Sequence, residues 1–203
     1  NRVDLFLNRK PNRGIHSDPG IFLIKLSQTS MENDWKSWHK ILQNRDQKRT
    51  DEISYQSEQK TKFINPLKIC MEINRYIQEG DVIIADGGDF VATASYILQP
   101  RSFSGWLDPG IFGTLGVGAG FIIGAQLTHP KSVVWAIYGD GAFGFSLMEF
   151  DTFVRHKIPV IAVIGNDAGW SQIYRDQIDI LKDPVSTELA QTQYHQAVAA
   201  LGG

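Results

Sequence analysis

VVWAIYGDGAFGFSLMEFDTFVRHKIPVIAVIGNDAGW, residues 133–170, is the stretch that decides the fold. A hydrophobic run from Val133 to Tyr138 ends in the polar turn Gly139-Asp140-Gly141. A second hydrophobic run, from Pro159 to Ile164, ends in Gly165-Asn166-Asp167. Short runs rich in valine and isoleucine are typical of strands that are buried on both faces of a parallel sheet.

The residues between the two runs predict a helix, with Leu147, Phe150 and Val154 on its buried face. A strand, a helix and a second strand in this order favour a parallel pair. Parallel strands end at the same edge of the sheet, so the two polar turns are expected to lie side by side. Ligands of open α/β sheets bind at that edge.

The chemistry of the two turns suits a divalent cation with a bound phosphate. Asp140 supplies a carboxylate and Asn166 an amide oxygen, which are hard ligands of the kind that Mg²⁺ prefers. Gly139 and Gly141 let the backbone approach a phosphate closely. A Gly-Asp-Gly turn alone is a weak signal and fits a solvated aspartate better. The asparagine at a second strand end, after a spacer of 24 residues (142–165), makes the metal-diphosphate interpretation much stronger.

This arrangement resembles the GDG…NN signature of thiamine diphosphate enzymes. The chain is especially similar to the 2-hydroxyacyl-CoA lyases and acetolactate synthase-like proteins of animals. The similarity is carried by DGGDF (86–90), by LDPGIFGTLGVGAGF (107–121) and by the segment 139–170. It departs from the general signature at Gly165, where the first asparagine of NN usually stands. Asn166 keeps the position of the metal ligand.

The resemblance implies a role for particular residues. Mg²⁺ would be bound by Asp140, Asn166 and the Ala168 carbonyl. The Gly113 carbonyl would accept a hydrogen bond from the 4′-amino group of the cofactor, and Leu115 would hold the cofactor bent; these two are the catalytic, cofactor-positioning candidates. The full set of predicted cofactor-binding residues is Gly88, Asp89, Gly113, Leu115, Gly141, Ala142, Gly169 and Trp170.

Asp89 is an unusual member of this set, because a carboxylate beside a diphosphate repels it. It could bind through water or through its backbone N–H, or it could simply cap the following helix. The glutamate that activates the cofactor in this family lies on an N-terminal domain of a facing subunit. We therefore expect a homodimer or homotetramer with a shared site, and expect residues 1–203 to be inactive alone.

The predicted fold class is α/β, a doubly wound parallel sheet with helices on both faces, preceded by the tail of another α/β domain. We assign 1–44 to the C-terminal tail of a central domain, 45–63 to a linker and 64–203 to a diphosphate-binding domain truncated at its C-terminus. Further helices are expected over 31–47, where tryptophans would pack, and over 114–127. Residues 106–113 are expected to form an irregular loop, and 176–188 a polar loop. The chain has no initiator methionine and is expected to be an internal fragment.

Composition excludes several classes of protein. A net charge of −2 provides no basic field for nucleic acid. The single cysteine, Cys70, excludes an internal disulfide framework and is expected to be a packed thiol. The uncharged stretch 110–127 is long enough for a membrane span. Its glycines, and the strand pattern that follows, favour a buried helix instead. Membrane attachment is expected only through a segment outside this chain.

Three functions are compatible with these observations. The first is a lyase that uses thiamine diphosphate and Mg²⁺ to cleave 2-hydroxyacyl-CoA into formyl-CoA and a shortened aldehyde, as in fatty acid α-oxidation. The second is carboligation of pyruvate of the acetolactate synthase type. The third is a non-catalytic, partner-binding module, against which the presence of both Asp140 and Asn166 argues. By resemblance the protein is expected at the endoplasmic reticulum membrane.

Overall fold

The computed structural model describes residues 4–29 and 34–203, which form two compact units, 1–49 and 50–203. In the first unit, a short 3-10 helix (η1, Asp4–Phe6) precedes α1 (Pro19–Ser27). The Asp18 carboxylate caps α1 by accepting the Ile21 N–H at 2.9 Å. None of the described residues of this unit is buried. The predicted central-domain tail and the predicted limits of the domains stay predictions.

Helix α2 (Lys36–Ser57) runs through the segment predicted as a linker. Residues 31–33 of the predicted helix 31–47 lie outside the described residues. The tryptophans expected to pack are exposed, Trp35 by 53% and Trp38 by 48% of their surface. Ile53, near the end of α2, is buried in the second unit.

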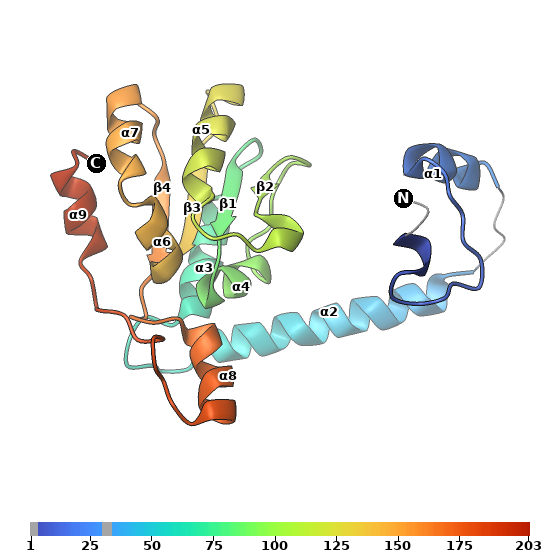
Figure 1. Ribbon diagram of the computed structural model, residues 1–203, viewed down its shortest axis with the longest axis horizontal. Coiled ribbons are helices and arrows are strands. Elements are labelled where there is room, and N and C mark those ends of the chain that lie inside the picture. The colour runs from blue at the N-terminus through green and yellow to red at the C-terminus, as the bar shows by residue number, and fades with distance from the viewer. Residues whose placement is uncertain (1–3, 30–33) are drawn as a thin grey trace. The chain divides into compact units, whose positions relative to one another are not determined.

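The second unit is built on a parallel sheet of four strands in the order β2-β1-β3-β4 (Figure 1). The strands are β1 (Val82–Asp86), β2 (Trp106–Leu107), β3 (Val134–Gly139) and β4 (Ile161–Gly165). Every pairing among them is parallel. β2 was expected to be irregular loop. Two residues are too short for a hydrophobic period, so only the pairing with β1 reveals this strand.

Helices cover both faces of the sheet, which confirms the doubly wound α/β prediction. Successive side chains of a strand point to opposite faces, so β1 sends Ile84 to one core and Ile83 to the other. The first core is covered by α5 (Gly118–Thr128), α6 (Asp140–Ser146), α7 (Glu149–His156) and α9 (Tyr194–Ala200). The second is covered by α3 (Pro66–Tyr76), α4 (Asp89–Ser95) and the end of α2.

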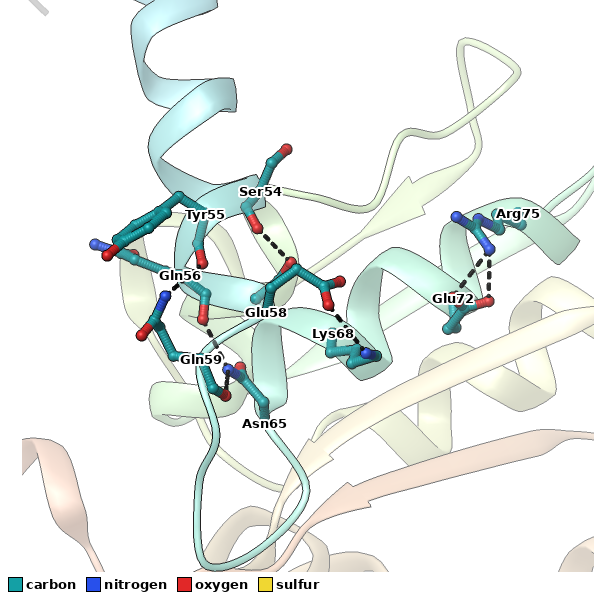
Figure 2. Close-up of polar contacts among 10 residues, drawn as sticks. Ser54, Tyr55, Gln56, Glu58, Gln59, Asn65, Lys68, Glu72 and Arg75 are labelled. Carbon is teal, nitrogen blue, oxygen red and sulfur yellow. Dashed lines mark hydrogen bonds and ion pairs between the residues drawn. The ribbon is translucent and has the colours of Figure 1, made fainter.

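Asn65 fixes the start of α3, as its position before Pro66 predicts. Its side chain accepts the Leu67 N–H at 3.0 Å. It also donates to the Gln56 carbonyl of α2 at 2.9 Å (Figure 2). Nearby, Lys68 pairs with Glu58 at 3.4 Å. A single amide thus caps α3 and ties its start to the end of α2.

Three further expectations are corrected. On α7 the buried residues are Phe150 and Phe153, whereas Val154 is 41% exposed. Helix α5 begins at Gly118, four residues later than predicted, and the buried Asp86 carboxylate accepts the N–H groups of Gly116 and Gly118 at this start. The first residues of the predicted polar loop 176–188 belong to a helix, α8 (Ser171–Leu181), in which Tyr174, Ile178 and Leu181 stand at helical spacing.

Cys70 is fully buried, as expected, and burial raises the pKa of its thiol to about 12. Among the described residues, no helix combines the length and the apolar character needed to cross a membrane. The stretch 110–127 instead forms a short 3-10 helix (η2, Gly110–Phe112), a turn and α5, which packs on the first core.

Candidate functional site

The site lies at the carboxyl edge of the sheet, where β1, β3 and β4 end. β3 and β4 pair in a register that places Gly139 opposite Gly165. Asp140 and Asn166 are therefore the first residues after two directly paired positions. The Gly139 N–H also donates to the Gly87 carbonyl at 3.1 Å, which joins the turn after β1 to the same edge. This juxtaposition is what the two polar turns predicted.

Asp140 is a buried carboxylate, with 2% of its surface exposed. It accepts the Gly141 N–H at 2.8 Å and the Gly169 N–H at 3.2 Å. Burial raises the pKa of this carboxyl, the Gly141 N–H counteracts the shift, and the charge of nearby Asp167 adds to it. A desolvated carboxylate beside a second acid is an environment that a bound cation would relieve.

Asn166 presents an oxygen that lacks a protein partner. Its amide nitrogen donates to the Thr192 carbonyl at 2.8 Å, which fixes the orientation of the side chain. The amide oxygen is buried and accepts no hydrogen bond. Such an orphaned acceptor costs roughly 1–3 kcal/mol unless a ligand satisfies it. A hard cation is the kind of ligand that suits it.

Ala168, the third predicted metal ligand, lies in a left-handed conformation with φ of 59°. Its carbonyl accepts the Leu189 N–H at 2.8 Å, and the Trp170 N–H donates to the Thr187 carbonyl at 2.8 Å. The segment 187–189 therefore holds the loop 168–170 in place. A carbonyl oxygen has a second lone pair, so this bond leaves one position for a cation.

The donor set fits Mg²⁺ in kind, because it offers a carboxylate, an amide oxygen and a carbonyl. Within residues 4–29 and 34–203, no cluster of three or more histidine, cysteine, aspartate or glutamate side chains could hold a metal ion. The predicted set contains one acid only and belongs to a different type of site, one that leaves positions for water and phosphate.

A cavity of about 250 Å³ opens between these loops. It is lined by all eight residues predicted to bind the cofactor and by Asp140. Asn166 and Ala168 do not line it. Asn166 lines an adjoining cavity of about 840 Å³ on the side of α3 and α4. The structure thus brings the predicted cofactor residues together, and their individual roles stay predictions.

Close contacts require glycine at two places in the cavity wall. A Cβ at Gly141 would lie 2.4 Å from the Trp170 ring, so the indole rests directly on the turn after β3. A Cβ at Gly87 would lie 1.8 Å from a Leu115 methyl group. Leu115 therefore packs across the turn after β1 and lines the cavity as well. These contacts bring four loops together around one small volume.

Asp86 is a site residue that the sequence analysis did not single out. It is fully buried, and its two carboxylate oxygens accept the Gly116 N–H at 2.9 Å and the Gly118 N–H at 2.7 Å. Burial raises the pKa of the carboxyl, and the two N–H groups counteract that shift. Asp86 thereby anchors the loop that carries Gly113 and Leu115. Its position at a strand end was the available signal.

Asp89, the unusual acid of the set, pairs with Arg175 of α8. Arg175 Nη2 lies 2.8 Å from Asp89 Oδ1, and Nη1 bonds the other oxygen. The hydrogen bond from Arg175 lowers the pKa of Asp89. Asp89 is the first residue of α4, and the N-cap position is held by Gly88, which contradicts the capping alternative. No feature of the local sequence links two residues 86 positions apart.

A sequence profile for the C-terminal TPP-binding domain of thiamine pyrophosphate enzymes matches residues 86–203. Mouse 2-hydroxyacyl-CoA lyase 2 is 47% identical over the whole chain, and the human protein is 43% identical. A probable acetolactate synthase of Mycobacterium bovis is 37% identical over 69% of the chain. The chain spans about a third of the length of the mouse and human relatives.

The fold has a counterpart among solved structures. A thiamine diphosphate-dependent 4-hydroxybenzoylformate decarboxylase of Rhodococcus jostii superposes with a TM-score of 0.64. The match covers 71% of this chain and 27% of the decarboxylase, at 15% sequence identity. At that identity the likeness concerns the fold alone, and it supports the doubly wound architecture found here.

Proposed function

Because the chain belongs to the thiamine pyrophosphate enzyme family through its C-terminal TPP-binding domain, we propose that it holds the Mg-diphosphate end of thiamine diphosphate in a carbon–carbon lyase. The observation that carries this proposal is the buried amide oxygen of Asn166, which accepts no hydrogen bond. Asn166 follows Gly165, and Gly165 pairs with Gly139, the residue before Asp140. In a turn with a purely structural role, a buried amide oxygen would normally accept a hydrogen bond.

Each loop has a distinct part in the proposal. Asp140, Asn166 and the Ala168 carbonyl hold Mg²⁺. The turns of Gly88 and of Gly141-Ala142, together with Gly169 and Trp170, enclose the diphosphate. Gly113 and Leu115 orient the end of the cofactor that carries the 4′-amino group. Asp86 keeps their loop in position by accepting two backbone hydrogen bonds. Thiamine diphosphate, when bound, supplies the carbanion chemistry for breaking a bond next to a carbonyl.

The proposed reaction is cleavage of 2-hydroxyacyl-CoA to formyl-CoA and an aldehyde one carbon shorter, as in fatty acid α-oxidation. Identities of 47% and 43% to proteins named 2-hydroxyacyl-CoA lyase 2 support this choice. A second candidate is carboligation of the acetolactate synthase type, which the 37% identity to the mycobacterial relative supports. Competition between 2-hydroxyacyl-CoA and pyruvate as substrates distinguishes the two.

The proposal extends to assembly and location. A homodimer or homotetramer would bring the activating glutamate of a facing subunit to this site, and attachment to the endoplasmic reticulum membrane would come through sequence outside this chain. Sedimentation of the full-length protein and fractionation of cells that express it test these two points.

The central test is a calorimetric titration of the full-length protein with thiamine diphosphate, carried out with and without Mg²⁺. We expect binding that needs Mg²⁺ and that weakens by at least about tenfold in Asp140→Ala and in Asn166→Ala, because each loses a metal ligand. The same variants should lose lyase turnover. Metal-independent binding, or unchanged affinity in both variants, would remove the basis for the assignment and favour a non-catalytic module.

A further inference from the structure

The charges around the 250 Å³ cavity are all negative. Its lining contains three carboxylates, those of Asp89, Asp140 and Asp167, and no lysine, arginine or histidine. Mg²⁺ bound at Asp140 would offset only part of the combined charge of these acids and a diphosphate. An anion placed here needs a further cation near the wall, since like charges at close range disfavour binding.

Arg175 is the cation that the structure supplies. Its guanidinium engages both oxygens of Asp89 in a forked arrangement, which is the geometry of the stronger ion pairs. Asp89 lines both this cavity and the adjoining larger one, and Arg175 lines the larger one, so the pair lies where the two cavities meet. The pKa of Arg175 is raised chiefly by Asp89, and the charges of Asp176 and of Asp167, another acid of the cavity, add to this shift.

We propose that Arg175 is a cofactor-affinity residue: it neutralises Asp89, so that an acid-lined cavity accepts a diphosphate. This inference rests on the proposed function and adds a residue to it. It also accounts for an aspartate in a position where its bare charge would repel the ligand. Together the two side chains carry no net charge. Loss of the arginine therefore weakens diphosphate binding because the Asp89 carboxylate is left without a counter-charge.

A purely mechanical role for the pair makes a different prediction. If the pair only clamps α8 against α4, loss of either partner breaks the clamp, and both single variants weaken binding to a similar degree. If Arg175 acts by neutralisation, the two variants have opposite effects and removal of both charges restores affinity. A double-mutant cycle therefore separates charge from geometry.

The experiment uses the full-length protein and four variants, R175Q, D89N, the double variant and R155Q. Arg155 is a matched control, because it also pairs with an aspartate, Asp151, at 2.7 Å and is similarly exposed, but lines neither cavity. Affinity for Mg-thiamine diphosphate is measured by calorimetry and by quenching of tryptophan fluorescence, for which Trp170 in the cavity wall is a reporter.

We expect R175Q to weaken binding by about tenfold and D89N to tighten it a few-fold, as single charges near a partly exposed site do. The affinity of the double variant should lie within about twofold of that of the wild type, and the affinity of R155Q should equal that of the wild type. The loss in R175Q should shrink between about 0.05 and 0.5 M NaCl, because salt screens the charge of Asp89. Equal losses in R175Q and D89N, or wild-type affinity in R175Q, would overturn the proposal.

Inorganic pyrophosphate with Mg²⁺ serves as a second probe, which separates this inference from the proposed function. The same pattern with pyrophosphate, without binding of thiamine diphosphate by the wild type, would refute the cofactor and support the charge mechanism. Binding of thiamine diphosphate that depends on Asp140 but not on Arg175 would support the cofactor and refute the charge mechanism. Far-ultraviolet circular dichroism confirms that each variant is folded.

Discussion

Gly165 stands where thiamine diphosphate enzymes usually carry the first asparagine of their second motif, and the structure gives a physical reason for the glycine. A Cβ built at Gly165 would lie 2.3 Å from Cγ, 2.5 Å from Cβ and 2.7 Å from Cδ1 of Phe90. Non-bonded carbons approach to about 3.5–4.0 Å at best. The Phe90 ring therefore occupies the space that any side chain at position 165 would need.

We expect Gly165→Ala to cost about 1–3 kcal/mol in the free energy of unfolding, the range for overpacking. For a domain of this size the melting temperature falls by about 3–9 °C. The end of β4 must shift to relieve the contact, so Asn166 moves and affinity for Mg-thiamine diphosphate falls as well. Differential scanning fluorimetry and calorimetric titration measure the two effects.

Two controls make the reasoning refutable. Gly124→Ala places a Cβ in open space on helix α5, and an alanine there should be neutral or slightly stabilising. In a Phe90→Ala background the Gly165→Ala change should cost less than half of its cost in the wild type, because the obstructing ring is gone. A Gly165→Ala protein with wild-type melting temperature and affinity would show that Phe90 yields freely, and the explanation would fail.

Three other predictions follow from buried or paired groups. Asp86→Ala should lower the free energy of unfolding by about 2–4 kcal/mol, because two backbone N–H groups lose their acceptor; urea titration measures this, and a loss under about 0.5 kcal/mol would contradict the anchoring role. Cys70 should resist a thiol reagent at pH 8 until the protein unfolds, because burial raises its pKa to about 12; stoichiometric labelling of the folded protein would refute this. The pKa of Asp89 is lowered by Arg175, so the contribution of their pair is present above the ordinary aspartate pKa of about 3.9 and disappears as the pH falls through the lower, folded-state pKa; the difference in melting temperature between wild type and D89N should therefore vanish in acid, and a difference that grows there would contradict the assignment.

Much of the fold could be predicted because the signals are local. The runs that end at Tyr138 and Ile164 are hydrophobic over the length of a strand, and each is closed by a polar turn. Asn65 before Pro66 likewise marks the start of α3 at the residue where the structure places it. Two elements were not predicted. β2 is only two residues long, which leaves no period to detect, whereas α8 does carry apolar residues at helical spacing, Tyr174, Ile178 and Leu181, which the loop prediction overlooked.

The sequence by itself determined which functional groups follow the strands, because the order of residues puts a carboxylate after one hydrophobic run and an amide after the next. Only the tertiary structure decided how these groups are held. The bonds from Asp86 to the turn before α5, the contact of Phe90 with Gly165 and the Asp89–Arg175 pair each join distant positions. Such contacts depend on how the strands and helices pack, so no local pattern of residues announces them.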